Sequence, residues 1–499
     1  MTTSHKLCAV ISGPTYSAAS SQIESSNDLA HLLEFRLDLL KDLSSKQLKH
    51  LQTQSSKPLI LTIRNHLLSD PAYIHALITQ LQPAYLDFEW NGPKDVIAQF
   101  QADFPNIKTI CSYHDVSGSS QELETIYNTM QAMSADYYKI AVMSHSTLES
   151  LKMLHFLKEN NQQNNLIGIC MGEAGQITRI LGPIFGNAIT YAAPTGDSVI
   201  APGQLDLITL LETYHHKHIN QETALFGLIG NPVHYSVSHL SHNKVFRDIG
   251  CNAIYVKMNL LDPEFSASLD YLVKLGWKGL SVTMPFKETV LSCVAEGRDL
   301  PAVNTLQINK NTINGFNTDG SGALRALLKV TPLHNKQVVL LGAGGVAKAI
   351  TQQLVIAGAR VTILNRSIDK AKQLAQSVGG GFGALSSFGD VASGGYDILI
   401  NCTSLGRKEG DCLINEMDLL PDRVVMDVLS TPRETSLIKA ALAKRCQIVY
   451  GMDMFVFQAI DQFAIWLGDD VRDRVEKSLK QHICTMNTIH KFKAKQGMS

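Results

Sequence analysis

Short apolar segments rich in β-branched residues alternate with helical stretches over roughly the first 205 residues of the 499-residue chain. The pattern predicts eight strands, at residues 7–12, 31–38, 59–64, 84–90, 108–115, 135–142, 165–171 and 188–193. A helix after each strand would return the chain to the start of the next parallel strand, which favours a closed barrel. The predicted fold class is therefore α/β, beginning with an N-terminal (β/α)8 barrel.

Polar residues stand at or near the ends of four successive predicted strands. They are Arg64, Glu89, His114 and Lys139, and each follows the one before it after 25 residues. Strand ends are often polar, so any one of these residues would mean little. Four of them at one pitch predict side chains that converge at the C-terminal rim, where barrels carry their active sites.

The pattern changes after residue 223, although strands and helices still alternate. The segment KQVVLLGAGGVAKAITQQLVIAGARVTILNRS, from residue 336, predicts a strand, a glycine turn, a helix and a second strand. Residues 455–490 predict helices, and the basic stretch beyond them predicts a solvated tail. We therefore expect the barrel at 1–218, an α/β substrate-binding domain at 223–325 completed by helices 455–490, and a Rossmann-like domain at 326–454.

Composition and charge indicate which partners and which compartment to expect. Hydrophobic residues make up 45% of the chain, charged residues 18%, and the formal net charge is −1. This balance is typical of a soluble globular protein and gives no reason to expect a nucleic-acid or membrane partner. The nine cysteines are scattered without a C-x-x-C pair, and no apolar stretch reaches about 18 residues. We expect a cytoplasmic protein that uses no metal.

Three histidines in the last barrel segment, His215, His216 and His218, suggest a metal site at first sight. Adjacent histidines point in different directions on a helix, and no cysteine or further histidine stands at metal-ligand spacing. The sequence therefore predicts a solvated helix end here.

Lys139 is the candidate nucleophile of the first half. It lies in YYKIAV, between apolar and aromatic neighbours, and desolvation together with a cation such as Arg64 would favour the neutral amine. Such an amine can condense with a ketone, and the resulting iminium acidifies the adjacent carbon. His114 suits the proton transfers that follow, and Glu89 could orient its ring. The residues alone leave a Schiff-base lyase and an aldolase open.

Motifs in this half resemble type I 3-dehydroquinate dehydratase over about 200 residues. They are EFRLD at 34–38, TIR at 62–64, DFE at 87–89, SYHD at 112–115, KIAV at 139–142, MG at 171–172 with TR at 178–179, and APGQ at 201–204. The resemblance implies a barrel in which Lys139 forms a covalent Schiff base, His114 is the general acid/base and Glu89 assists it. It also implies substrate contacts at Ser12, Glu34, Arg36, Arg64, Arg179, Ser198 and Gln204.

The glycine turn of the second half follows an apolar strand and opens a helix, as in dinucleotide-binding folds. It consists of Gly342, Ala343, Gly344, Gly345 and Val346, followed by a small residue, Ala347. The next strand ends in Asn365-Arg366, where an acid would favour NAD; the arginine favours NADP. Lys287 in SVTMPFKE and Asp319 in GFNTDG are candidates for a coupled acid/base pair beside a reacting carbonyl.

Further motifs resemble shikimate dehydrogenase over about 270 residues. They are GNPV at 230–233, VTMPFK at 282–287, AVNT at 302–305, GFNTD at 315–319, the glycine turn, NCTS at 401–404, GM at 451–452 and Gln458. The resemblance implies that Lys287 is the main acid/base residue, paired with Asp319. It implies shikimate contacts at Ser236, Ser238, Thr283, Asn304, Asp319 and Gln458. It implies NADP(H) contacts at Gly342, Ala343, Gly344, Gly345, Val346, Asn365, Arg366 and Gly451.

Together the resemblances imply a bifunctional enzyme of the shikimate pathway. It would convert 3-dehydroquinate to 3-dehydroshikimate and reduce that product to shikimate with NADPH, with small molecules as its partners and a homo-oligomer left open. His239, Ser281 and Pro301 depart from the dehydrogenase pattern, which often has Pro, Asn and Gly there, and they put the exclusion of quinate-like compounds in doubt. Two alternatives remain: a preference for quinate or NAD, and one half that serves as a catalytically inactive module.

Overall fold

The computed structural model describes residues 5–117, 122–161, 163–194, 201–408, 411 and 413–482. The chain forms two compact units, Met1–Gly227 with Asn252–Trp277, and Leu228–Cys251 with Lys278–Ser499. None of the helices within the described ranges is long and apolar enough to cross a membrane.

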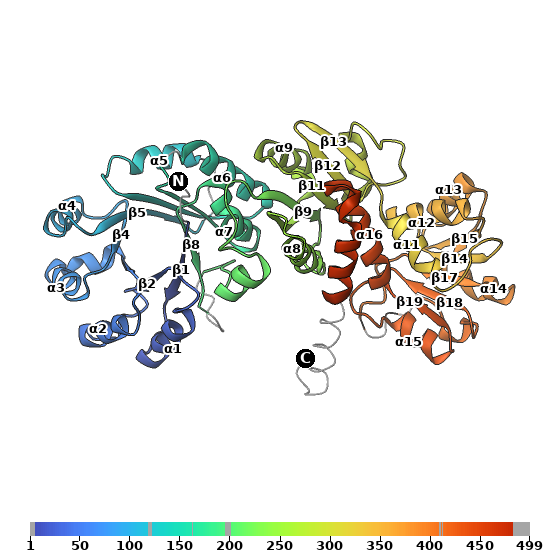
Figure 1. The fold of residues 1–499 in the computed structure, drawn as a ribbon, viewed down its shortest axis with the longest axis horizontal. Helices are drawn as coiled ribbons and strands as arrows, with labels where there is room; N and C mark the ends of the chain where they lie inside the picture. The colour runs from blue at the N-terminus through green and yellow to red at the C-terminus, as the bar shows by residue number, and fades with distance from the viewer. Residues whose placement is uncertain are drawn as a thin grey trace. The chain divides into compact units, whose positions relative to one another are not determined.

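The first unit contains an eight-stranded sheet with the order β7-β6-β5-β4-β3-β2-β1-β8 (Figure 1). Its strands are β1 Lys6–Ile11, β2 Leu32–Arg36, β3 Leu59–Ile63, β4 Tyr85–Glu89, β5 Lys108–Asp115, β6 Tyr137–Met143, β7 Leu166–Met171 and β8 Ile189–Ala192. Neighbouring strands are parallel, and each strand predicted from the sequence is present with ends shifted by at most two residues. Ala188 N donates to Leu166 O (3.1 Å) where β7 and β8 begin, so the barrel is nearly closed and the prediction is confirmed.

Helices surround the strands on the outside of the barrel (Figure 1). They are α1 Tyr16–Ser26, α2 Ser45–Thr53, α3 Pro71–Leu81, α4 Lys94–Asp103, α5 Leu123–Met130, α6 Thr147–Asn160 and α7 Gln176–Leu181. Local signals start them: Ser44 and Gln47 form a capping box at α2, and Asp70 caps α3 ahead of Pro71. Apolar side chains such as Val10, Ile60, Ile110 and Ile167 fill the barrel interior.

Residues 252–277 group with the barrel and supply β10 Ala253–Asn259 and α9 Phe265–Leu275. Thr147 Oγ1, at the start of α6, donates to Asn259 O (2.8 Å). Lys158 Nζ, near the end of α6, donates to Lys274 O (2.9 Å), which lies in the last turn of α9. Both ends of α6 therefore form hydrogen bonds with this segment.

The segment that follows β8 differs from its prediction. His216 is fully buried, its Nε2 lies 3.1 Å from Arg179 O, and its ring contacts that of His5 edge-on at 4.8 Å. Only His218 is exposed. The expectation of a solvated helix end is wrong for His216, because a short π-helical turn at Thr209–Thr213 precedes it and changes which side chains face the barrel.

Acid should destabilise the first unit through these histidines. Burial lowers the pKa of His216 to about 3 and that of His5 to about 4, whereas an unfolded histidine titrates near 6.5. The unfolded chain therefore binds protons first as pH falls, and stability that is complete above pH 6.5 is lost toward pH 3–4. We expect the free energy of unfolding to fall as pH decreases from 7 to 5, with a slope that approaches about 1.4 kcal/mol per pH unit for each histidine below about pH 6, as measured by urea titration.

The variant His216→Gln keeps a side-chain donor but does not titrate. It should remove the part of this pH dependence that His216 contributes and keep the part due to His5, whereas His218→Gln, which changes an exposed histidine two residues away, should leave the pH dependence unchanged. Equal slopes in all three proteins would contradict the assignment.

The second half of the chain contributes two sheets. A five-stranded sheet has the order β10-β9-β11-β12-β13, with β11, β12 and β13 antiparallel. Its further strands are β9 Ala224–Gly230, β11 Gly279–Val282, β12 Thr305–Asn309 and β13 Thr312–Phe316. Helices α8 Ser238–Asp248, α10 Phe286–Thr289 and α11 Asp319–Leu328 occur in this part of the chain.

The other sheet is parallel, with the order β16-β15-β14-β17-β18-β19. Its strands are β14 Gln337–Leu341, β15 Arg360–Asn365, β16 Gly381–Ala384, β17 Ile398–Asn401, β18 Val424–Asp427 and β19 Gln447–Val449. This is the doubly wound order of dinucleotide-binding folds, whose ligands lie where the order reverses, between β14 and β17. The predicted Rossmann-like fold is confirmed.

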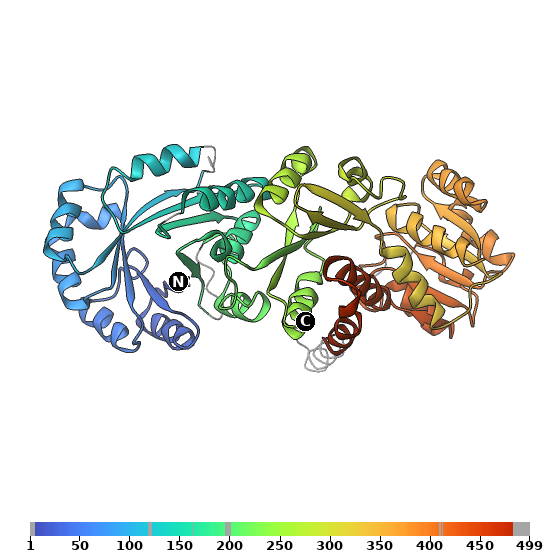
Figure 2. The same ribbon diagram turned by 45° about the horizontal axis from the view of Figure 1, so that its top comes forward.

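Helices cover both faces of this sheet (Figure 2). They are α12 Gly345–Ile356, α13 Ile368–Val378, α14 Phe388–Ser393 and α15 Ser436–Ala443. Helix α16, Gly451–Leu467, packs against α11, and residues 472–482 form a further helix. The C-terminal chain therefore returns to the part that holds the five-stranded sheet.

Candidate active sites

Lys139 lies in the middle of the barrel wall. It is the third residue of β6 and is 4% exposed. The strand register pairs it with Ser112, two residues before His114 on β5, so Lys139 lies deeper than the rim position that its 25-residue spacing predicted. The difference arises because barrel strands are staggered, and equal spacing in sequence does not mean equal height.

Carboxylates surround the Lys139 ammonium group. Nζ forms an ion pair with Asp87 Oδ2 and lies 4.0 Å from Glu34 Oε1; both acids are almost fully buried. Glu34 in turn accepts a hydrogen bond from Thr62 Oγ1 (2.6 Å), and Nζ lies 4.7 Å from the centre of the Tyr191 ring. These contacts correct the expectation of an apolar surrounding with a nearby cation, since the direct partner of Lys139 is an acid.

Asp87 is a candidate functional residue that the sequence analysis did not single out. A carboxylate in the middle of YLDFE, an otherwise apolar strand, was the available signal. Asp87 is 1% exposed, and its Oδ1 has no hydrogen-bond partner among the described residues. A buried carboxylate with a free oxygen beside an amine can receive that amine's proton.

Arg64, Glu89 and His114 form a hydrogen-bonded group at the barrel rim. Arg64 Nη1 lies 3.0 Å from Glu89 Oε1 and 2.9 Å from His114 Nδ1. Glu89 Oε2 also accepts from Asn65 N (3.0 Å), which fixes the carboxylate at the end of β4. Glu89 therefore reaches the imidazole through Arg64, rather than by the direct contact that its predicted role suggested.

The surroundings of His114 favour the neutral form of its imidazole. Burial, followed by the positive charges of Lys139, Arg64 and Arg36, lowers its pKa well below the usual range. A guanidinium can only donate, so Nδ1 accepts from Arg64 and the neutral ring carries its proton on Nε2. The imidazole is thus uncharged at neutral pH and has both an N–H and a lone pair.

The other residues predicted to contact the substrate of the barrel differ in their burial and in their partners. Arg36 forms a two-pronged ion pair with Asp38 (2.9 and 2.7 Å). Arg179 is buried and donates to Cys170 O (2.6 Å); burial lowers its pKa to about 10, and its Nε has no partner among the described residues. Ser12 follows β1, and Gln204 is buried after the last strand, while Ser198 lies outside the described residues.

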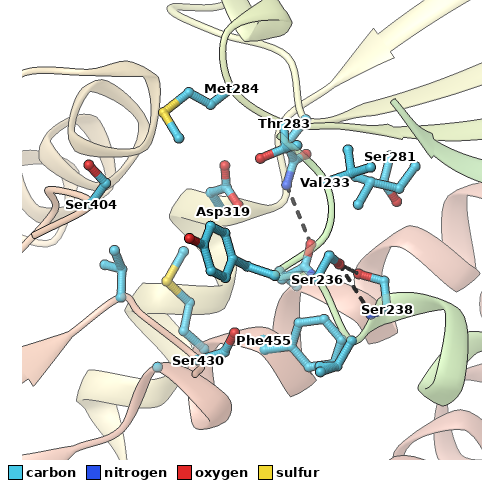
Figure 3. A pocket seen from close by; sticks show the side chains of 18 of the residues that line it. Val233, Ser236, Ser238, Ser281, Thr283, Met284, Asp319, Ser404, Ser430 and Phe455 are labelled. Atoms are coloured by element: carbon cyan, nitrogen blue, oxygen red, sulfur yellow. Dashed lines mark hydrogen bonds between the residues drawn. The ribbon is translucent and has the colours of Figure 1, made fainter. Parts of the chain in front are cut away.

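A second site occupies a cavity of about 640 Å³ in the second unit. Figure 3 shows Ser236, Ser238, Ser281 and Thr283 on one side of it and Ser404 and Ser430 on the other, with Asp319 between them. The first group belongs to the part with the five-stranded sheet, whereas Ser404 and Ser430 follow β17 and β18 of the parallel sheet. The cavity therefore lies between the two lobes of the unit.

Lys287 and Asp319 meet in this cavity. Lys287 Nζ lies 2.5 Å from Asp319 Oδ2, and both side chains are largely buried. Lys287 is on α10 after β11, and Asp319 begins α11, where Asn317 Oδ1 accepts from its main-chain N (3.0 Å). A coupled lysine–aspartate pair of this kind can hold and release one proton beside a reacting carbonyl.

Hydroxyl and amide groups surround the pair. Ser236 Oγ and Ser238 Oγ lie 2.7 Å apart (Figure 3). Asn304 Nδ2 donates to Thr318 Oγ1 (3.0 Å) and lies 3.5 Å from Gln458 Oε1. The structure thus brings all the predicted shikimate contacts, Ser236, Ser238, Thr283, Asn304, Asp319 and Gln458, to one cavity.

The glycine turn fits a dinucleotide. Gly342 has a φ of +111°, which requires glycine, and a Cβ added to Gly344 would meet nothing within 4 Å. Gly344 is the N-cap of α12 and no side chain caps the helix, so its first amides are free to bind phosphate. A Cβ on Gly345 would lie 3.4 Å from Lys287 Cβ, which places the turn directly against the acid/base pair.

Other predicted cofactor contacts lie around the parallel sheet. Arg366, at the end of β15, is exposed and has no salt bridge within the described part of the chain. Asn365 Nδ2 donates to Ser367 O (3.0 Å). Gly451 begins α16 and lies so close to Leu429 O that a Cβ would approach it to 2.2 Å. No group of three or more metal-ligating side chains occurs among the described residues.

The cavity lining includes Ser281, one of the departures from the dehydrogenase pattern, and further residues that no motif predicts. Ser281 Oγ lies 3.2 Å from Gln462 Oε1, and Gln462 Nε2 donates to Thr305 Oγ1 (2.8 Å). Arg407, Lys408 and Asp411 line the cavity from the loop after β17. No local motif marks Gln462, Arg407, Lys408 or Asp411, because they reach the cavity only through the packing of α16 and of the β17 loop.

The fold and the two sites define a class: a barrel enzyme with a buried lysine, joined in one chain to a nucleotide-dependent dehydrogenase. Comparison with protein families agrees. Residues 7–221 match Type I 3-dehydroquinase, residues 228–306 match the Shikimate dehydrogenase substrate binding domain, and residues 325–434 match Shikimate / quinate 5-dehydrogenase.

The relatives include two that match over 93% of this chain and one that matches over 50% of it. The Shikimate biosynthesis protein AroDE of Chlamydia pneumoniae is 34% identical over 93% of this chain and 95% of its own length. The chloroplastic bifunctional 3-dehydroquinate dehydratase/shikimate dehydrogenase of Arabidopsis thaliana is 30% identical over 93% of this chain and 82% of its own. The shikimate dehydrogenase (NADP(+)) of Pyrococcus furiosus is 38% identical over 50% of this chain and 93% of its own. The chain belongs to the family of bifunctional 3-dehydroquinate dehydratase/shikimate dehydrogenases, as its motifs predicted.

Proposed function

We propose that this protein dehydrates 3-dehydroquinate to 3-dehydroshikimate in its barrel and reduces that product to shikimate in its second unit. The observation that carries the proposal is that one chain holds two separate lysine–aspartate pairs, Lys139–Asp87 and Lys287–Asp319, each beside the groups its step requires. The product expected of the first site is the ketone that the second site would reduce.

In the barrel, Asp87 accepts a proton from the Lys139 ammonium group, and the amine adds to the substrate ketone. The carbinolamine then loses its hydroxyl as water, with the proton returned from Asp87, and an iminium forms on Nζ. The iminium draws electrons from the neighbouring carbon, so that carbon's proton can be removed. Expulsion of the substrate's hydroxyl and hydrolysis of the iminium release the product and restore Lys139.

His114 serves these later proton transfers. It is neutral at working pH, but in the substrate-free geometry its Nδ1 lone pair is engaged by Arg64. A substrate carboxylate or hydroxyl that draws Arg64 away frees this imidazole to remove the carbon-bound proton and then give it to the leaving hydroxyl. Arg64 would thereby couple substrate binding to the availability of the base.

In the second unit, Lys287 places its ammonium group beside the ketone oxygen and supplies a proton as negative charge develops there. Asp319 holds that ammonium group in position through its 2.5 Å contact. Ser236, Ser238, Thr283, Asn304 and Gln458 orient the ring hydroxyls and carboxylate of the substrate. The glycine turn, with Asn365, Arg366 and Gly451 nearby, would hold NADPH, which would supply the hydride.

A coupled assay tests the proposal. Purified protein given 3-dehydroquinate and NADPH should consume NADPH after a lag, and 3-dehydroshikimate should remove the lag. Borohydride added with 3-dehydroquinate should leave a covalent adduct on Lys139, identified by peptide mass spectrometry. Absence of NADPH consumption with either ketone, or an adduct on another residue, would overturn the assignment. Quinate and NAD, tested alongside, measure the alternative preference, which His239, Ser281 and Pro301 leave open for quinate.

Arg366 should decide the choice of cofactor. Its side chain is exposed at the end of β15, where it can pair with the 2′-phosphate of NADPH but not with the hydroxyl of NADH. Loss of a hydrogen bond to a charged group costs about 10- to 100-fold in binding, so Arg366→Gln should raise KM for NADPH by that factor and leave KM for NADH nearly unchanged. Arg360→Gln, at the opposite end of the same strand, is the matched control.

A further inference from the structure

Arg407 holds a position across the cavity of the second unit. It lies in the loop after β17, half-buried, and its Nη1 donates to Thr431 O (2.8 Å). Its guanidinium carbon lies 5.0 Å from the centre of the Tyr235 ring. Tyr235 belongs to the opposite lobe and directly precedes Ser236 in the chain. Arg407 thus reaches from the nucleotide-binding lobe to the loop that carries the Ser236 and Ser238 hydroxyls.

Among the charged residues that line the cavity, Arg407 differs from Lys287 in its ion pairing. They are the cations Lys287, Arg407 and Lys408 and the anions Asp319 and Asp411. Lys287 is already paired with Asp319. Arg407 has no carboxylate within salt-bridge distance among the described residues, and its contacts are a carbonyl oxygen and an aromatic face. These contacts hold the guanidinium in place without a direct ion pair, although its positive charge also acts on the buried Asp427 carboxylate.

The serine pair opposite supplies neutral donors for an acid. Ser236 Oγ and Ser238 Oγ lie 2.7 Å apart, and Ser238 begins the eleven-residue helix α8. A carboxylate held there would gain two hydroxyl donors but no full positive charge from these two serines. A planar guanidinium next to the same loop offers that charge, with two parallel N–H groups in the geometry that a carboxylate matches.

We propose that Arg407 is a specificity-determining residue that pairs with the carboxylate of the substrate on the Ser236–Ser238 hydroxyls. The inference rests on the proposed function, since it takes a cyclic hydroxy acid as the ligand. Because Arg407 and the serines come from different lobes, the carboxylate joins the two walls of the cavity. The site therefore selects acids over uncharged polyols of similar shape.

Steady-state kinetics of shikimate oxidation with NADP⁺ test this role. Arg407→Gln should raise KM for shikimate about 10- to 100-fold, the range expected for loss of a hydrogen bond to a charged group, with kcat changed less than KM. Arg407→Lys should recover part of the loss. The uncharged methyl ester of shikimate should bind the wild type about as weakly as shikimate binds the variant, and Arg407→Gln should weaken its binding little further.

Matched variants separate this pairing from general effects. Arg433→Gln removes another guanidinium that stacks on a tyrosine, 4.5 Å from the Tyr450 ring and outside the cavity lining, and should leave KM unchanged. Lys408→Gln should have a small effect that salt abolishes, since Lys408 is exposed. An unchanged KM for shikimate in Arg407→Gln, or equal losses for the acid and the ester, would overturn the inference. A wild type that does not oxidise shikimate would instead overturn the proposed function.

Discussion

Replacing Lys139 with alanine is expected to abolish dehydration of 3-dehydroquinate and leave reduction of 3-dehydroshikimate at its wild-type rate. Loss of a covalent nucleophile removes the whole iminium route, and nucleophile deletions of this kind cost about 10⁴-fold or more in kcat. Dehydration is measured by the absorbance of the conjugated product, and reduction by NADPH consumption with 3-dehydroshikimate supplied directly.

The control for this variant is Lys152→Ala, which removes an exposed lysine from the next helix, α6. It should leave both activities unchanged. Because Lys139 is buried in an ion pair with Asp87, the thermal stability of Lys139→Ala must be compared with that of Lys139→Met, which fills the space. If a folded Lys139 variant dehydrates the substrate at more than about one-hundredth of the wild-type rate, the Schiff-base mechanism is refuted.

The second large effect is expected at the Lys287–Asp319 pair. Lys287→Met and Asp319→Asn should each lower kcat for reduction of 3-dehydroshikimate by about 10²- to 10⁴-fold, because the developing negative charge on the ketone oxygen loses its proton donor or that donor's positioning group. The double variant should lose little more than either single variant, since the pair acts as a unit. Dehydration in the barrel should be unaffected.

A matched ion pair serves as the control. Lys244 and Asp248 lie 2.7 Å apart on α8, and Lys244 is not among the residues that line the cavity. Lys244→Met should therefore leave kcat for reduction unchanged. Losses in the Lys287 and Asp319 variants that simply multiply in the double variant would show that the two residues act separately.

The architecture was accessible from the sequence because its signals are local and repeated. Eight apolar strands with helices between them predict a barrel, and the glycine turn between a strand and a helix predicts a Rossmann-like domain. The burial of individual side chains, in contrast, depends on tertiary packing. His216 looked like part of a solvated helix end, yet it is buried against His5, more than 200 residues away in the chain.

Some residues of the two sites could be predicted from the sequence, and others could not. Lys287 and Asp319, 32 residues apart, were predicted to meet, and they do. Asp87 stands in the motif DFE, but a sequence does not reveal which inward-facing carboxylate touches which lysine. Arg407 had no motif at all, since its contact with Tyr235 exists only when two lobes face one another. Chemistry that depends on one segment is readable from the sequence, whereas chemistry shared between distant segments requires the fold.

The grouping of residues 252–277 with the barrel bears on how the fusion can be taken apart. The family matches suggest a simple junction between residues 221 and 228, as if two enzymes were joined end to end. The α6 contacts with Asn259 and Lys274, and the packing of His155 against Tyr271, cross that junction. Cutting the chain there would remove the partners of these α6 groups, so the barrel half taken alone would lack contacts that it has in the intact chain.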